Sequence, residues 1–398
     1  MANSKFIRRG NDTMMPGIVC GVAFCVFSFT YLYFYQDNLL AMEQHILSNG
    51  LTRYSRLGGA VVLTILAALL QFAVDAATRQ CIKHPALTYF PSAMMLAIIT
   101  DISAEVDSGY TLGKWLWLAP LLLTMFAAAA YVSASLLANN EGLGHKSQAR
   151  MLAENLTITV LTMLFIVATA NTDRTFHRRM KAENLILQGK YTDALDVGAN
   201  GTPADPSLTM LNAYALSMTS ALGECLFEYN PTGGSDALLP GYGAKAMLLP
   251  EDRLFCHVAR PLKQNMRPLH YLLWMRLHHH DKKPLQQYLL CAYLMDGRID
   301  DFAKELAKDT AMLNNDRLPK HYREALVLYT HLRTAPLVNY QNSVMEADYN
   351  DLQTIARTTR DSRQRKALIQ KTYGNTYWYY YMYGRKKQDA GKTGRKNI

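Results

Sequence analysis

The chain has 398 residues, enough for two or three domains, and its mean hydropathy near zero averages an apolar first half with a charged second half. Its formal net charge of +10 gathers beside apolar runs and in the last fourteen residues. Because a nucleic-acid interface needs a contiguous basic face, nucleic acid is not an expected partner, and membrane lipid is. The six cysteines include no C-x-x-C pair, so neither a metal site nor a redox site is expected.

Long runs of apolar residues predict transmembrane helices near 16–35, 57–74, 115–138 and 155–171. A fifth run, 86–100, has fifteen residues and contains Pro91, so it either spans the membrane or forms a re-entrant or interfacial helix. Lys5, Arg8 and Arg9 precede the first run, which predicts an uncleaved signal anchor with a cytoplasmic amino terminus. Residues 1–173 are therefore expected to form a bundle of four to five transmembrane helices.

The side of the membrane reached by the second half depends on the run 86–100. If this run spans, Lys and Arg near the helix ends count seven on the cytoplasmic side and seven on the other. If it does not span, the count becomes ten against four, because a basic cluster after Asn171 moves to the cytoplasmic side. The sequence leaves the side unresolved, and the positive-inside rule favours four spans and a cytoplasmic second half.

Three carboxylates lie at the ends of the predicted spans, at Asp37, Glu43 and Asp75. Polytopic glycosyltransferases that use lipid-linked sugars carry an acidic residue after their first span, where it acts as a general base. These are the candidate catalytic residues if the protein is an enzyme. The alternative interpretation of the stretch around Asp37 and Glu43 is an ordinary amphipathic turn at the lipid headgroups.

Residues 174–384 carry a pattern typical of tetratricopeptide helical hairpins. In A-E-N-L-I-L-Q-G-K-Y-T-D-A-L-D, a glycine ends one helix and a tyrosine and an alanine follow at the expected spacing, with a proline further on. Two more glycines suggest two further units, separated by a turn-rich insertion over 231–261. The predicted fold is all-α, with an α-solenoid after the bundle, and its repeat-packing residues are Gly189, Tyr191, Ala194, Pro206, Gly223 and Gly297.

Other clusters in this half have simpler interpretations. His278 and the two histidines after it point in different directions on a helix, so they predict a helix C-terminal cap and no metal site. The aromatic run 373–383 either grips a partner or packs a terminal helix on the last repeat. The basic stretch 385–398 is expected to be a disordered tail.

Four stretches resemble an uncharacterised Bacteroidetes family of polytopic inner-membrane proteins with a tetratricopeptide-like C-terminal domain. They are Y-F-Y-Q-D-N-L-L-A-M-E-Q-H, Y-F-P-S-A-M-M-L-A-I-I-T-D, L-P-K-H-Y-R-E-A-L-V-L-Y and T-Y-W-Y-Y-Y. The resemblance implies the inner membrane of a two-membrane bacterium, and it supplies no catalytic residues.

The sequence names no reaction and favours a protein that is not an enzyme. We expect a membrane-anchored helical-repeat scaffold that binds a protein partner, in cell-envelope assembly or secretion, because solenoids offer extended concave surfaces. The alternative is a membrane-embedded glycosyltransferase-like enzyme acting on a lipid-linked or surface glycan. No cofactor is expected for the scaffold.

Overall fold

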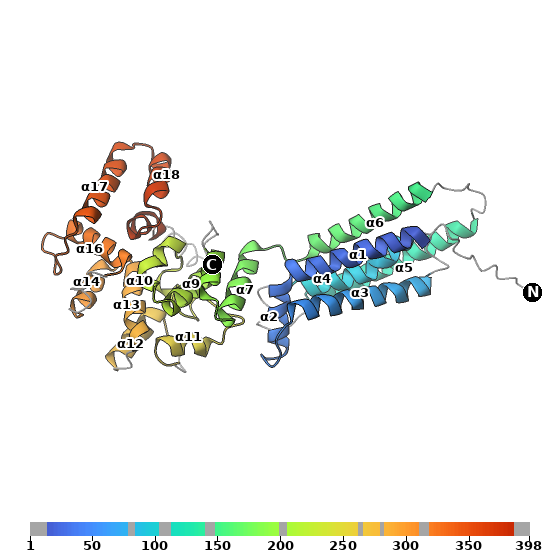
Figure 1. Cartoon of the computed structure of the whole chain (residues 1–398), viewed down its shortest axis with the longest axis horizontal. Helices are drawn as coiled ribbons and strands as arrows, with labels where there is room; N and C mark the ends of the chain where they lie inside the picture. Colours follow the sequence, from blue (N-terminus) through green and yellow to red (C-terminus); the bar gives the residue numbers. More distant parts are fainter. Residues whose placement is uncertain are drawn as a thin grey trace, which may run out of the picture. The chain divides into compact units, whose positions relative to one another are not determined.

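The computed structural model of the chain describes residues 14–78, 84–102, 113–139, 148–198, 205–261, 266–278, 282–309 and 318–385. Every regular element in these ranges is a helix, which confirms the all-α prediction for the described residues. The predicted basic tail lies outside them, apart from Arg385. The chain divides into two compact units, 1–177 and 178–398 (Figure 1).

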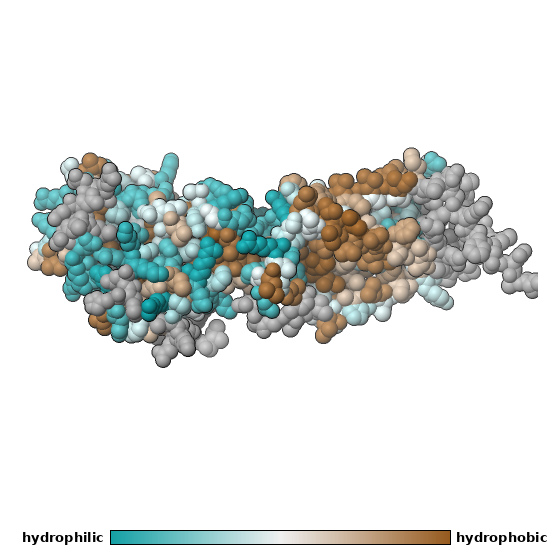
Figure 2. All heavy atoms as spheres, turned by 60° about the horizontal axis from the view of Figure 1, so that its bottom comes forward, coloured by the Kyte–Doolittle hydropathy of each residue, from teal (hydrophilic) through white to brown (hydrophobic). Residues whose placement is uncertain are grey.

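Four helices of the first unit are long and apolar enough to cross a membrane. They are α1 (Met14–Phe34), α3 (Arg56–Thr78), α5 (Trp115–Asn139) and α6 (Gln148–Thr169). These bounds match the predicted spans, except that α6 begins seven residues before residue 155, because its polar first two turns are helical as well. The hydrophobic residues cover the outside of this unit (Figure 2), as a surface facing acyl chains requires.

A short amphipathic helix, α2 (Asp37–Leu47), follows α1 and packs against α1, α3 and α4 (Phe90–Thr100). Leu39, Leu40 and Met42 are buried, while Leu47 is exposed at the last turn. A left-handed pair, Asn49 and Gly50, then reverses the chain toward α3. The reversal is compact because the Gly50 N–H donates to the His45 carbonyl, which satisfies one of the last helix carbonyls.

The run 86–100 forms the centre of the bundle. It is a continuous helical segment, a 3₁₀ turn η2 (Pro85–Tyr89) followed by α4, and most of its side chains are buried. Pro91 fits because it occupies the first turn of α4, where its missing N–H has no helical partner to lose. The segment packs against α1, α3 and α6, which explains how a short helix can be stable inside this unit without itself facing lipid.

The second unit consists of short helices around a large core of leucine, alanine and tyrosine side chains. After α7 (Arg174–Leu187), which contains the boundary between the units, its elements are α8 (Tyr191–Gly198), α9 (Pro206–Met218), α10 (Leu222–Cys225), η4 (Leu226–Tyr229), η5 (Gly234–Ala237), α11 (Glu251–Val258), α12 (Pro268–Leu277), α13 (Lys283–Met295), α14 (Ile299–Ala307), α16 (Lys320–Leu332), α17 (Ser343–Thr358), α18 (Ser362–Tyr373), α19 (Tyr377–Tyr379) and a π-helical turn, η6 (Tyr380–Gly384).

The aromatic run near the C-terminus belongs to this core. Tyr377, Trp378, Tyr379 and Tyr380 are buried, and the Tyr377 and Tyr380 rings lie 5.0 Å and 4.7 Å from the Phe227 ring. Their polar atoms are satisfied, since the Tyr380 hydroxyl donates to the Met295 carbonyl. Of the two interpretations of this run, the structure favours the packing of a terminal helix.

Candidate functional site

Asp37 is held in a polar cluster at the start of α2. Its Oδ2 lies 3.3 Å from the Arg56 Nε, and its Oδ1 accepts a hydrogen bond from the Asn38 side chain. The Arg56 guanidinium also stacks over the Tyr33 ring at 4.1 Å and donates to the Tyr33 carbonyl. These contacts join the end of α1, the start of α2 and the start of α3, so they give Asp37 a structural role at the turn.

Glu43 lies two turns further along α2 and is half-buried. Burial raises the pKa of its carboxyl to about 7, so a substantial fraction is protonated near neutral pH. Asp75 lies in the last turn of α3, nineteen residues after Arg56. Because Arg56 contacts Asp37 at the start of α3, Asp75 lies about 28 Å from that contact along the helix axis. The structure therefore does not bring Asp75 together with Asp37 in one site.

Two of the predicted repeat glycines end helices in the same way. Gly189 and Gly297 have φ of +77° and +68°, and the residue after each donates its N–H to a carbonyl five residues back. This is the Schellman cap, which needs a left-handed residue. Each glycine is followed two residues later by the next helix, α8 or α14, so the α7–α8 and α13–α14 connections share one turn geometry. Helices α13 and α14 also pack against each other.

Gly223 differs from this pattern. It lies inside α10, and the left-handed residue of the α9–α10 turn is Ser220, with φ of +59° and the same two hydrogen bonds. A Cβ atom at Gly223 would lie 2.7 Å from the Tyr322 Cζ, so glycine is needed here for close packing against α16. Gly189 and Gly223, 34 residues apart, therefore do not occupy equivalent positions in two repeats. The α9–α10 connection nevertheless has the same turn geometry, with Ser220 as its left-handed residue.

The remaining predicted packing residues lie in or against the core. Ala194 is buried in α8 beside α9, and Tyr191 meets Tyr214 edge to face at 6.4 Å between ring centroids. Pro206 occupies the first turn of α9, whose N-cap Asp205 accepts from two backbone N–H groups. These residues hold α8 against α9.

A buried histidine–glutamate pair lies in the core of the second unit, and no sequence pattern predicted it. The Glu324 Oε2 accepts from the Tyr377 N–H at 2.7 Å and lies 2.9 Å from the His321 Nδ1. The His321 Nε2 accepts from the Phe227 N–H, so the proton of a neutral imidazole is on Nδ1. Both side chains are buried, which makes the pair a structural link between η4, α16 and α19.

No group of three or more potential metal ligands occurs among the described residues. His278 stacks on Trp274 at 4.0 Å, and its Nδ1 lies 2.8 Å from the Trp274 carbonyl oxygen at the end of α12. This is the helix-capping position predicted for it, while the next two histidines lie outside the described residues.

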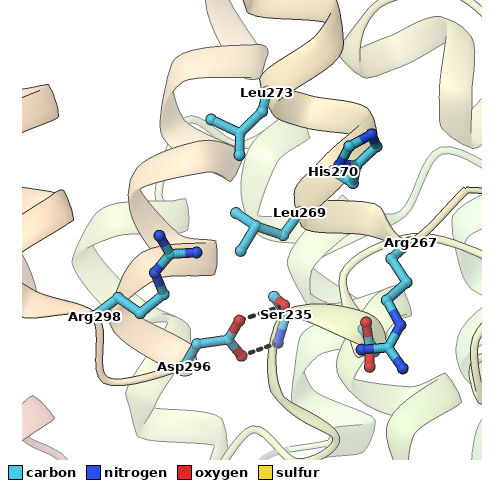
Figure 3. Close-up of a pocket in the computed structure, with 8 residues that line it drawn as sticks. Ser235, Arg267, Leu269, His270, Leu273, Asp296 and Arg298 are labelled. Atoms are coloured by element: carbon cyan, nitrogen blue, oxygen red, sulfur yellow. Dashed lines mark hydrogen bonds between the residues drawn. The ribbon is translucent and has the colours of Figure 1, made fainter.

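A recess with a volume of about 220 Å³ opens beside α12 (Figure 3). Leu269 and Leu273 line it together with the polar side chains of three segments, among them Arg267, His270 and Arg298. The lining combines guanidinium, imidazole and carboxylate groups with two leucines, since Asp236 and Asp296 also line the recess. Such a surface suits a ligand or peptide that presents an apolar group beside polar groups.

One wall of the recess is the 3₁₀ turn η5, which Asp296 holds in place. Asp296 accepts from the Ser235 N–H at 2.9 Å and from the Ser235 hydroxyl at 2.6 Å (Figure 3). Gly233 has φ of +90°, and a Cβ atom there would lie 2.7 Å from the Ala237 Cβ. The sequence marked this segment only as an irregular insertion, although the P-T-G-G-S-D stretch carries the signal of a fixed turn.

The recess continues onto an exposed apolar face of α12. Leu269, Leu273 and Leu277 repeat every four residues, and Leu273 and Leu277 are 37% and 75% exposed. Arg267 lies at the start of the same helix, 5.9 Å from the centroid of the exposed Tyr242 ring. We call Tyr242, Arg267, Leu269, Leu273 and Leu277 the α12 face.

Comparison with protein families gives one match. The profile of a family of unknown function (DUF6057) matches residues 245–384, which run from the segment before α11 to the end of η6. The match includes α12 and excludes the first unit, so similarity to an uncharacterised family is supported for the C-terminal part. No curated protein and no solved structure matches the chain.

Proposed function

We propose that the chain is a multi-pass inner-membrane protein of a two-membrane bacterium, whose tetratricopeptide-like helical unit holds a protein partner in cell-envelope assembly or secretion. The four apolar helices support the anchoring role. The three helix connections with one turn geometry support a repeat-like array, in which each pair of helices buries its apolar face against its neighbours.

The α12 face is the observation that carries the binding role. Most apolar side chains of the second unit are buried, whereas Leu277 and Leu273 are exposed next to a recess. An exposed apolar patch with a polar rim is typical of protein interaction sites. The lining carries charges of both signs, Arg267 and Arg298 together with Asp236 and Asp296, and so favours a partner segment that places polar groups beside an aliphatic or aromatic side chain.

Exposed-residue substitutions test this role on the full-length protein. Leu277→Glu introduces a charge at the most exposed leucine of the α12 face, and Val344→Glu is the matched control, because Val344 is 69% exposed on α17. We expect a stoichiometric partner recovered from solubilised membranes with the wild type to be lost at least tenfold with Leu277→Glu and kept with Val344→Glu, an effect of roughly 1.4 kcal/mol or more.

The proposal fails if the same partner is recovered equally with both variants. It also fails if the partner remains bound after residues 178–398 are deleted, because the anchor would then carry the binding.

A further inference from the structure

We infer that residues 85–102 cross the membrane as a fifth, central crossing, so that the second unit lies on the opposite side of the membrane from the amino terminus. The inference uses only contacts within the first unit. It does not depend on the proposed binding function.

Both ends of the central segment are bonded to α6. The Ala86 N–H donates to the Asn155 Oδ1 at 3.1 Å, and the Asn171 side chain donates to the Ile102 carbonyl. Both bonds join residues 69 positions apart. The segment and α6 therefore run parallel, and the offset between paired residues is the same at both ends. From residue 155 to Thr169, where α6 ends, the helix rises about 21 Å, most of the thickness of a hydrocarbon core of about 30 Å.

The central segment runs antiparallel to α3. The Gln71 side chain donates to the Thr88 hydroxyl, and the Ser92 hydroxyl donates to the Ala67 carbonyl, so later residues of the segment meet earlier residues of α3. The chain therefore enters the segment at the end of the bundle where α3 finishes.

The same segment runs parallel to α1. The Tyr89 ring lies 4.9 Å from the Phe24 ring, and near the other end the Tyr31 side chain lies beside Thr100. Gly21 also lies beside Tyr89, since a Cβ atom at Gly21 would be 3.0 Å from the Tyr89 hydroxyl oxygen. The start of the segment thus lies nearer the Met14 end of α1, beside its middle turns, and its finish lies near the Phe34 end.

The next two helices complete the path. The Trp115 Nε1 donates to Asp101 at 2.7 Å, so α5 starts where the central segment finishes. α6 starts at the opposite end and returns, because Asn171 donates its N–H to the Thr100 carbonyl. The crossings are therefore α1, α3, the central segment, α5 and α6, and the chain leaves the bundle opposite to Met14.

The length of the run 86–100 leaves its crossing undecided for a physical reason. A helix surrounded by other helices needs no continuous apolar surface against lipid. In addition, a 3₁₀ turn rises about 2.0 Å per residue, so it covers more distance than an α-helical turn with the same number of residues. With five crossings the charge counts are equal, seven against seven, so the count over the whole chain does not set the orientation. The first helix then sets it through its basic flank, Lys5, Arg8 and Arg9. They place the amino terminus in the cytoplasm and the second unit outside it, where its partner must also be.

Thiol labelling of the full-length protein tests the topology. Cys256 is the exposed cysteine among the described thiols, so a membrane-impermeant maleimide applied to intact spheroplasts should label the wild type, and Cys256→Ser should lose most of that label. In the Cys256→Ser background, Ser4→Cys should be labelled only after lysis. Labelling of both thiols only after lysis would overturn the inference, as would labelling of both in intact spheroplasts.

Reporter fusions give an independent reading. Alkaline phosphatase fused after Ile398 should be active, while the same reporter fused between Glu141 and Gly142, in the α5–α6 connection, should be inactive. The reverse pattern, activity between Glu141 and Gly142 and none after Ile398, would overturn the inference. With four crossings the α5–α6 connection would lie outside the cytoplasm and the second unit inside it.

Discussion

At the scale of single residues, buried polar side chains fix how the helices of the second unit meet. Glu183 accepts hydrogen bonds from the Met247 and Leu248 N–H groups at 2.8 Å and 2.7 Å, and Arg179 pairs with it at 3.3 Å. Together with the His321–Glu324 pair, it satisfies backbone donors in segments that have no helical partner. Such groups are costly to leave unpaired, so each carboxylate determines one local path of the chain.

The buried histidine–glutamate pair should contribute more to stability than an exposed one. Glu324→Gln removes the charge that receives two hydrogen bonds, and we expect the free energy of unfolding of the full-length protein in detergent to fall by about 1–3 kcal/mol. Glu346→Gln is the control, because Glu346 pairs with His331 at 2.7 Å with both side chains partly exposed. The control should lose at most about 1 kcal/mol. Equal losses in urea denaturation would contradict the assignment of Glu324 as a structural link.

His257 should make the stability of the second unit depend on pH. Burial, assisted by the nearby Lys282, lowers its pKa, and its Nε2 lies 2.8 Å from the Ser217 hydroxyl. The unfolded chain therefore binds a proton at a higher pH than the folded chain does. As the pH falls below the usual histidine pKa of about 6.5, this group favours unfolding, so stability falls with acidification.

The pH effect can be isolated with His257→Asn. Between about pH 7 and about pH 5, the midpoint of thermal unfolding, followed by tryptophan fluorescence, should fall less in this variant than in the wild type. An identical fall in both proteins would show that other groups cause the pH dependence.

At the scale of elements, the central helix of the bundle depends on side chains from its neighbours. Asn155 is fully buried, its Oδ1 accepts from the Ala86 N–H, and its Nδ2 donates to the Met151 carbonyl at 2.8 Å. Pro85 and the 3₁₀ turn leave backbone donors at the start of the segment without helical partners. A single amide from α6 therefore both caps the segment and sets its register.

Removing this amide should weaken the bundle. Asn155→Leu leaves the Ala86 N–H unpaired, and we expect a loss of about 1–2 kcal/mol, measured as a lower midpoint of unfolding in detergent. Thr157→Val is the control, because Thr157 is exposed and its hydroxyl donates only within its own helix. Its effect should stay within about 0.5 kcal/mol. If both variants unfold like the wild type, Asn155 does not hold the segment.

At the scale of the whole molecule, the sequence alone predicted those helices that face the same solvent along their whole length. The four long spans follow from composition alone, because each must present apolar side chains to lipid over its full length. The helix ends at Gly189 and Gly297 follow from the local requirement for a left-handed residue.

The features that the sequence did not reveal depend on contacts between distant residues. The path of the run 86–100 is set by Asn155 and Asn171, which no local pattern connects to it. Gly223 seemed to be a turn glycine, but it serves a close contact with Tyr322, while Ser220 takes the left-handed conformation. The α12 face is also a tertiary property, since its leucines could equally have been core residues by spacing alone.

The parallel pairing of the central segment with α6 has a consequence for biogenesis. The segment is synthesised before α6, and the partner of its first backbone donor is 69 residues away in the chain. Until the ribosome has released α6, that donor and the Ile102 carbonyl lack their partners in a medium that offers no water. The first three crossings therefore form an incompletely packed assembly until α6 is inserted. Packing of α6 against the central segment then completes the bundle.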